Sequence, residues 1–278
     1  MMSKNKFAIF IISHERADRQ LTYNLLRRCN YTGKIYIVVD DEDKELELYH
    51  ELYPNELIVF SKEEMLKDTD TVDNFRNKKT ALLPSNFCFE YAKSLKLDYF
   101  LKLDDDLRDL MYRYVDEGKL KASKFTRMDD IMAVLIDYME KTKVDCLSFG
   151  NAGSYIGGAN GRFKDKIGRN NAGSFLFKTD TDIRFLGTRQ EDYNIVAKYS
   201  QVGRLFFEIL DLCITTSQRG DNKGGCAEDY KDTGMYVVNF YSIIVAPSCT
   251  KIGFKKDFNI RRNYNAMCPK ILNERWKK

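Results

Sequence analysis

The sequence predicts an α/β fold in which a mostly parallel sheet carries helices on both faces. Over residues 1–106, strand-like apolar runs alternate with segments of helical spacing, which is the pattern of a doubly wound sheet. The first run, residues 7–12, is apolar throughout, as expected of a strand covered on both faces. Acidic residues directly follow two of the runs, and open α/β sheets bind ligands at the carboxyl ends of their strands. Two runs of the second half, residues 174–177 and 183–186, have the look of short antiparallel strands, and we expect that half of the sheet to be more antiparallel.

The elements of the first half follow one another closely. Strands are expected at residues 7–13, 34–39, 57–60 and 99–103. Helices are expected up to about Cys29 after the first strand, at 46–52, and within 74–96, where Pro84 marks a kink or a late helix start. Residues 62–75 are polar and mixed, and are expected to form a loop with one helical turn.

The second half has longer polar connections. Apolar spacing predicts a helix at 128–141, and an acidic pair opens another helix that runs toward Tyr199. The glycine-rich stretch 150–173 is expected to be a mobile loop that folds over an anionic donor or contacts an acceptor through Arg162, Lys164, Lys166 and Arg169. Strands are expected at residues 144–149, 174–177, 183–186, 204–212 and 235–246, with a polar connection at 218–234.

The composition is that of an ordinary globular protein. With 278 residues, 44% of them apolar, the chain can bury a large core, and we expect a single domain over 1–250 with halves at 1–106 and 107–250. The longest apolar run, residues 7–12, is too short to cross a bilayer and no signal peptide precedes it, so a cytoplasmic protein is expected. The seven cysteines are scattered without a C-x-x-C pair, which predicts reduced thiols.

The last 28 residues, 251–278, are basic. They hold nine Lys or Arg against Asp257 and Glu274, a net charge of +7, so that residues 1–250 carry −3 of the total of +4. Aromatic residues stand among these charges, and such a segment can lie along a polyanion, with phosphates meeting the cations and rings packing on bases. The alternative is a solubilising terminal segment.

The acidic triplet Asp104-Asp105-Asp106 follows the apolar strand 99–103 without a gap. Three crowded like charges repel one another unless a cation or solvent relieves them. Asp104 and Asp106 point to the same side of an extended chain, which suits one oxygen-seeking divalent ion, Mg²⁺ or Mn²⁺. An ion held by carboxylates leaves positions open for the phosphate oxygens of a nucleotide. The alternative is a solvated acidic turn that caps the next helix.

Polar residues also follow the first two strands. Ser13 ends the first strand where backbone N–H groups and Arg16 can meet phosphate or a base. Asp40 ends the second strand, where an acid is well placed to accept hydrogen bonds from a ribose or a uracil-type ring. Lys78 and Lys79 can reach a diphosphate at these strand ends, although surface lysines are common without such a role.

An Asp-rich turn after a strand, with Glu191-Asp192 at a later helix start, resembles the metal-dependent GT-A glycosyltransferases. Segments 7–18, 31–43, 73–75 and 99–106 together resemble the TET-associated glycosyltransferases, a mostly phage family related to the base J glucosyltransferase and to the C-terminal domain of GREB-type proteins. The resemblance implies a GT-A-like fold and transfer of a sugar from a nucleotide donor of the UDP-glucose type. The acceptor it implies is the hydroxymethyl group of a modified pyrimidine in DNA, in the host cytoplasm if the protein is phage-encoded.

The resemblance also assigns roles, with donor binding in residues 1–106 and acceptor binding in 107–250. Asp104 and Asp106 would hold the metal ion, and one member of the Glu191-Asp192 pair, Asp192 before Glu191, would be the base. Many GT-A enzymes add a C-terminal His ligand, but the histidines of this chain are His14 and His50, so another residue or water must complete the site. The donor would be bound by Ser13, Arg16, Asp40, Lys79 and Asp105.

Three alternatives remain open at the level of sequence. The acceptor can be a protein Ser or Thr, as the GREB-type relatives suggest. The fold can be a non-catalytic module that binds DNA or protein. A dehalogenase-type phosphatase also places D-x-D after a strand, but it normally continues with Gly and Thr or Val, where this chain has Leu107 and Arg108.

Overall fold

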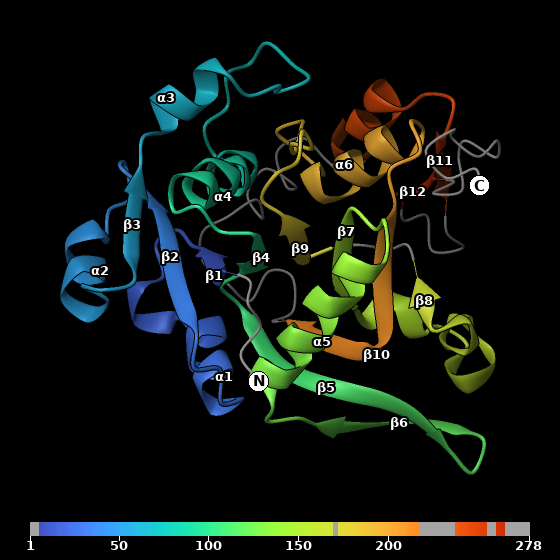
Figure 1. Ribbon diagram of the computed structural model, residues 1–278. Helices are drawn as coiled ribbons and strands as arrows, with labels where there is room; N and C mark the ends of the chain where they lie inside the picture. The colour runs from blue at the N-terminus through green and yellow to red at the C-terminus, as the bar shows by residue number, and fades with distance from the viewer. Residues whose placement is uncertain (1–5, 169–171, 217–236, 255–259, 265–278) are drawn as a thin grey trace.

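A computed structural model describes residues 6–168, 172–216, 237–254 and 260–264 (Figure 1). Most strands join one sheet in the order β3-β2-β1-β4-β9-β7-β10-β5-β6, with β8 paired to β10, and β11 and β12 form a separate hairpin. The strands are β1 (Phe7–Ile12), β2 (Lys34–Asp40), β3 (Leu57–Phe60), β4 (Tyr99–Asp104), β5 (Leu107–Asp116), β6 (Lys119–Lys124), β7 (Cys146–Gly150), β8 (Ile167–Gly168), β9 (Ser174–Lys178), β10 (Phe206–Thr216), β11 (Thr250–Phe254) and β12 (Ile260–Tyr264).

Helices lie on both faces of this sheet, as the sequence predicts. None in the described part of the chain is long and apolar enough to cross a membrane. A further helical stretch covers residues 237–245. The others are α1 (Leu21–Arg28), α2 (Leu46–Leu52), α3 (Lys62–Lys67), α4 (Leu82–Ser94), α5 (Met128–Lys141) and α6 (Glu191–Ser200), with short 3₁₀ turns η1 (Ala17–Arg19), η2 (Ala152–Tyr155), η3 (Gly158–Asn160) and η4 (Arg162–Asp165).

The parallel half of the sheet brings three strand ends together. β3, β2, β1 and β4 are mutually parallel neighbours, and Ile12 of β1 is in register with Asp104 of β4. β9 then runs antiparallel to β4, and β5 antiparallel to β10, so the second half is mixed. The predicted α/β fold, parallel first and more antiparallel later, is confirmed. The carboxyl ends of β1, β2 and β4 therefore share one edge.

The two faces of the sheet have different cores. Ile9 and Ile11 of β1 belong to the cluster under α1 and α5, whereas Phe10 and Ile12 belong to the cluster under α4 and α6. Successive side chains of a strand point to opposite faces, so a strand covered on both sides is apolar without a break. The second cluster is largely aromatic, with Phe89 and Phe177 packed 4.9 Å apart, centroid to centroid.

Two predicted strands are wrong. Residues 183–186 form no strand, because Asn86 of α4 binds their backbone instead: its side-chain amide donates to Phe185 O at 3.0 Å and accepts from Phe185 N at 2.9 Å. The predicted strand 235–246 is helical over 237–245, where Val238, Tyr241 and Ser242 are buried at helical spacing, while residues 235 and 236 lie outside the described residues. A short apolar run does not by itself distinguish a buried helix from a strand.

The β5–β6 hairpin was not predicted from sequence. It follows the acidic triplet directly and projects from the rest of the molecule (Figure 1). β6 is the last strand of the sheet and is mostly exposed, with lysines at 119, 121 and 124. Charged lysines on an exposed edge discourage pairing with other chains. The sequence of β6 is mostly polar and lacks the apolar run that identifies a buried strand, which is why the hairpin was not predicted.

The glycine-rich stretch is held against β10 where the structure describes it. Tyr155 donates its hydroxyl proton to Leu210 O at 3.0 Å, and Ser154 bonds to the buried carboxylate of Glu208. Part of the basic segment 251–278 forms the β11–β12 hairpin, while its residues 265–278 and the polar connection 218–234 lie outside the described residues. The cysteines in the described residues are free: Cys29, Cys88, Cys146, Cys213 and Cys249.

We expect Asn86→Ala to destabilise the fold by about 2–4 kcal/mol, because it leaves two buried backbone groups of Phe185 without partners. Urea unfolding measures this change. Lys93→Ala, on the exposed side of the same helix, should change the free energy of unfolding by no more than about 0.5 kcal/mol. Equal effects of the two substitutions would contradict the role given to Asn86.

Candidate active site

The acidic triplet forms a tight turn at the carboxyl end of β4. Asp104 is the last residue of β4, and β5 begins at Leu107. The side chain of Asp104 is 38% exposed, so it is accessible to a ligand, and its Oδ1 accepts a hydrogen bond from Lys102 Nζ at 2.8 Å. Asp106 is partly buried, and burial together with Asp104 and Asp105 raises its pKa to about 6.

A buried lysine lies beneath this turn. Lys102 is 1% exposed, and its ammonium is 5.8 Å from the ring centroids of both Phe175 and Phe185. Burial disfavours its charge, but the carboxylates of Asp104 and Asp192 outweigh burial and raise its pKa above the ordinary value. The ammonium form of Lys102 is therefore favoured, and it compensates the charge of the neighbouring acids.

Gly173 connects Asp104 to the pair at the start of α6. Its N–H donates to Asp192 Oδ2 at 2.9 Å, and its carbonyl accepts from the Asp104 N–H at 3.4 Å. Its φ of +70° is in the left-handed region, and a Cβ on it would lie 3.6 Å from Asp104 Oδ2. Glycine at this position lets the two acidic elements approach without strain.

Glu191 and Asp192 are the first two residues of α6. The residue before them, Gln190, has a φ of 59° and makes no side-chain cap, so the acids themselves complement the positive end of the helix dipole. Burial and the neighbouring Asp192 raise the pKa of Glu191, while Lys102 opposes this shift. The structure thus gathers the acids at 104, 191 and 192 around one buried ammonium.

The acids of this edge are oxygen donors of the kind a divalent cation prefers, although among the described residues they do not bring three ligand atoms within 4.8 Å of one another. Crowded carboxylates with a pKa raised by their neighbours, as at Asp106, are those that an oxygen-seeking ion would relieve. Asp104 keeps its Oδ1 on Lys102 and presents an exposed side chain. No histidine belongs to the group, which agrees with the hard-ion character expected of Mg²⁺ or Mn²⁺.

Asp105 has a different role from its neighbours. It is 3% exposed, and it accepts hydrogen bonds from Ser13 Oγ at 2.6 Å and from Arg16 Nη1 at 2.5 Å. Ser13 Oγ also bonds to Tyr49 OH at 2.7 Å. These contacts hold the end of β1 against the end of β4. Removal of one partner from a buried ion pair of this kind strongly destabilises the fold, because the other charge is left buried and unpaired.

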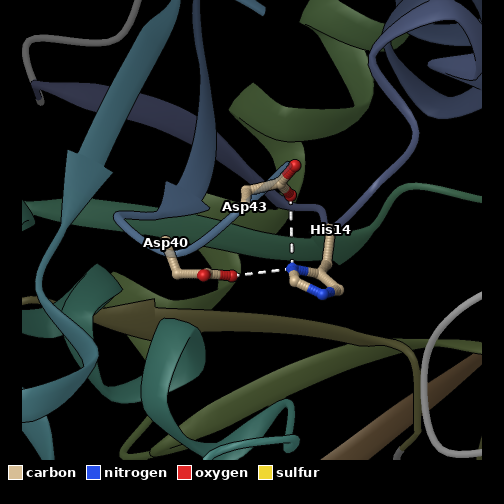
Figure 2. Close-up of side chains that lie close together, drawn as sticks. All are labelled: His14, Asp40 and Asp43. Atoms are coloured by element: carbon tan, nitrogen blue, oxygen red, sulfur yellow. Dashed lines mark hydrogen bonds and ion pairs between the residues drawn. The ribbon is translucent and has the colours of Figure 1, made fainter. Parts of the chain in front are cut away.

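A second charged cluster lies at the end of β2, and Figure 2 shows its three central residues. His14 Nδ1 is 2.8 Å from Asp40 Oδ2 and 3.2 Å from Asp43 Oδ2, and Lys62 Nζ is 2.7 Å from Asp40 Oδ1. Hydrogen bonds to Asp40 and Asp43 raise the pKa of His14 to about 9. Burial opposes the charge of Asp40, but His14 and Lys62 still hold its pKa below the usual value.

This cluster has the atoms of a metal site, but it also contains its own cations. His14, Asp40 and Asp43 each offer one ligand atom, all within 4.8 Å of one another. A metal ion would have to displace the proton that the raised pKa of His14 favours, and Lys62 Nζ already lies 2.7 Å from Asp40 Oδ1. We interpret the cluster as a charge network that shapes the loop after β2.

The two lysines predicted to reach a diphosphate lie on the loop between α3 and α4. Lys78 Nζ pairs with Glu42 at 2.8 Å and with Glu63 at 3.0 Å. Lys79 is exposed, and its carbonyl accepts from Arg189 Nη1 at 3.3 Å. The loop therefore bridges the end of β2 and the segment before Glu191.

Sequence reasoning missed Lys102, His14 and Lys62. A signal for Lys102 was present, because a lysine inside an otherwise apolar strand is buried only when it is paired. Nothing in the sequence around His14 or Lys62 indicates that they are paired, because their partners Asp40 and Asp43 lie in another segment of the chain.

The fold is similar to the folds of solved glycosyltransferase structures. Glucosyl-3-phosphoglycerate synthase from Mycobacterium tuberculosis in complex with Mg²⁺ and UDP superposes with a TM-score of 0.51 at 9% identity, over 94% of this chain and 87% of that chain. The complex with Mn²⁺, UDP and phosphoglyceric acid gives 0.50 at 10% identity with the same coverage. TarS 1–349 of S. aureus in complex with UDP gives 0.46 at 15% identity, over 86% and 65%.

The chain belongs to the TET-Associated Glycosyltransferase family, whose profile matches residues 7–225. The resemblance expected from the four sequence segments is thereby confirmed, and the protein is a glycosyltransferase. No curated protein has significant similarity to the sequence.

The raised pKa of His14 makes stability depend on pH. A group whose pKa is higher in the folded chain, about 9 against an ordinary 6.5, stabilises the fold fully below pH 6.5, and this contribution is lost as the pH rises through 9. We expect the difference in unfolding free energy between the wild type and His14→Gln to shrink from pH 6 to pH 9.5, measured by urea unfolding at each pH. A difference that grows with pH would contradict the assignment.

Proposed function

We propose that this glycosyltransferase transfers a sugar from a nucleotide donor of the UDP-glucose type to the hydroxymethyl group of a modified pyrimidine in DNA. The observation that carries the proposal is the meeting of Asp104 and Asp192 at Gly173, on the edge of the sheet where α/β folds bind ligands. Family membership supports the acceptor class, and the similar synthase from M. tuberculosis was crystallised with UDP and Mg²⁺ or Mn²⁺.

In this proposal Asp104 and Asp106 hold Mn²⁺ or Mg²⁺. The bound ion supplies positive charge beside the leaving diphosphate, where negative charge develops as the glycosidic bond breaks. Lys102 cannot replace it, because its ammonium is buried and committed to Asp104. The lysine instead holds one carboxylate oxygen in place and leaves the rest of the Asp104 side chain accessible.

Asp192 is the proposed base. The acceptor hydroxyl oxygen attacks the anomeric carbon, the bond from that carbon to the diphosphate oxygen breaks, and the hydroxyl proton passes to the Asp192 carboxylate. The Gly173 N–H fixes the orientation of this carboxylate. Glu191, the less favoured candidate, has a raised pKa and shares the first turn of α6. A single base suffices if the anomeric carbon is inverted.

The donor nucleoside is proposed to bind at the ends of β1 and β2. Asp40 lies there, bonded to His14, and Arg16 bonds to Asp105 after the end of β4. Ser13 and Asp105 are buried and hydrogen-bonded to each other. Their proposed role is therefore to keep the ends of β1 and β4 in place beside the bound donor, rather than to contact it. Lys79 is exposed on the adjoining loop, where it can approach the diphosphate.

The decisive experiment supplies Mn²⁺, hydroxymethylated duplex DNA and a panel of sugar nucleotides, then digests the DNA to nucleosides for mass spectrometry. A nucleoside heavier by one sugar residue is expected with one donor. Unmodified DNA is the control for the hydroxymethyl group. Unchanged DNA, together with sugar found on a Ser or Thr of an added protein, would replace the DNA acceptor with a protein acceptor.

We expect Asp104→Asn to reduce transfer by at least about 100-fold, because the amide still accepts from Lys102 but no longer offers a charge to the cation. Asparagine is chosen because alanine would also leave the buried Lys102 unpaired. Mn²⁺ binding by calorimetry should weaken in parallel. Asp116→Asn, at the far end of β5, is the control and should keep full activity and metal affinity.

Asp192→Asn is expected to retain the fold, the donor affinity and the metal affinity, and to lower kcat by about 100-fold or more, since one proton acceptor contributes factors of about 10² to 10⁴. Single-turnover kinetics with saturating donor separates this loss from binding. Glu191→Gln should have the smaller effect. The reverse order of the two variants would transfer the role of base to Glu191.

A further inference from the structure

Phe75 is the most exposed large apolar side chain among the described residues, with 83% of its surface accessible. It lies on the loop between α3 and α4, next to Arg76, whose side chain is 71% exposed. An exposed single phenylalanine flanked by a cation has no packing function in the fold. Aromatic rings presented to solvent near a reaction centre commonly contact a ligand or a partner.

The loop that carries Phe75 is held in place from both sides. Asp73 Oδ2 accepts hydrogen bonds from Thr188 Oγ1 at 2.7 Å and from Tyr241 OH at 2.5 Å. The other oxygen of Asp73 accepts from the backbone N–H of Phe75 at 2.8 Å. The Phe75 backbone is therefore fixed to the segment before α6 and to the helix at 237–245, while its ring remains free.

The backbone on each side of Phe75 is strained. Val72 has a φ of 65° and Arg76 a φ of 52°, and a β-branched residue with positive φ is rare. Such conformations persist only where surrounding contacts enforce them, and they concentrate at functional sites. Asp73 supplies that enforcement here, because it binds Thr188 and Tyr241 from the middle of the strained stretch.

The position of the loop relates Phe75 to the proposed acceptor site. Thr188, which anchors the loop, stands three residues before Glu191. Lys78, three residues after Phe75, pairs with Glu42 beyond the end of β2. The loop thus spans from the donor end of the sheet edge to the start of α6, where the proposed base Asp192 lies.

We infer that Phe75 is a wedge that enters the base stack of duplex DNA at the modified pyrimidine and keeps that nucleotide turned out toward Asp192. Enzymes that act on a base extrude it from the duplex, and inserted apolar side chains stabilise the opened step. Arg76 beside the ring supplies a cation for a flanking phosphate, in exchange for its exposed pairing with Glu63 at 3.5 Å. This inference rests on the proposed DNA acceptor.

The test compares Phe75→Ala with wild type on three acceptors of one sequence: a fully paired duplex, the same duplex with an abasic site opposite the modified base, and the single strand. On the paired duplex we expect kcat/KM to fall about 10- to 100-fold, because unstacking is no longer compensated. On the abasic duplex and the single strand the loss should be less than about threefold, since the base there is already free to turn out. Phe75→Trp should restore most of the duplex activity.

Two further measurements separate a wedge from a structural or donor-binding role. A 2-aminopurine next to the modified base should brighten when the wild type binds the duplex, and should not brighten with Phe75→Ala. The control, Val134→Ala, removes another exposed apolar side chain, 64% accessible, from α5 and should match the wild type on every acceptor.

Each outcome has a definite meaning. Equal losses on all three acceptors, or none on the paired duplex, would overturn the wedge while leaving the DNA acceptor in place. Wild-type enzyme that transfers sugar to none of the three DNAs would remove the proposed acceptor, and the wedge with it. Retained brightening of 2-aminopurine with Phe75→Ala would also contradict the inference.

Discussion

The buried ammonium of Lys102 is the charge on which the candidate active site depends. It lies among phenylalanine rings on one side and bonds to Asp104 on the other, so it cannot leave when the site fills or empties. Without it, the acids at the end of β4 and at the start of α6 would lie close together with no buried cation to offset their charge. The positive charge of Lys102 therefore offsets the repulsion among these acids, so that the protein can fold with several carboxylates at one edge of its sheet.

The second requirement is that two distant segments meet at one edge. Residues 104 and 192 are separated in the sequence by a hairpin, a helix and a glycine-rich stretch. They meet at Gly173, whose N–H donates to the Asp192 carboxylate and whose carbonyl accepts from the Asp104 N–H. Asp105 connects the same turn to the end of β1, because its carboxylate accepts hydrogen bonds from Ser13 and Arg16. The neighbouring aspartates of one triplet thus divide into a buried residue that joins two strand ends and two residues whose side chains are partly accessible to solvent. Loss of activity on replacing Asp105 would report on the fold as much as on chemistry.

Sequence patterns identify those features whose cause is local. Continuous apolar strands, the helix at 128–141 and the acidic strand ends follow from burial on both faces and from the geometry of parallel sheets. The errors have causes that lie elsewhere in the chain. Residues 183–186 resemble a strand, yet their backbone is bound by Asn86, about a hundred residues earlier. Residues 237–245 contain aromatic and branched side chains typical of strands, yet helical spacing of the buried ones prevails.

The same limit explains why the division of roles within the triplet was not visible in the sequence. Three adjacent aspartates are chemically equivalent until the fold buries Asp105, leaves Asp104 and Asp106 partly buried, and pairs Asp104 with Lys102. The partly buried acids, with Glu191 and Asp192, carry more negative charge than one ammonium offsets. A diphosphate is itself an anion, so these carboxylates alone would repel it. In the proposed function, the nucleotide donor is therefore expected to bind only together with, or after, a divalent cation. With Asp106 as a ligand in that proposal, its raised pKa of about 6 means that cation binding below that pH releases a proton.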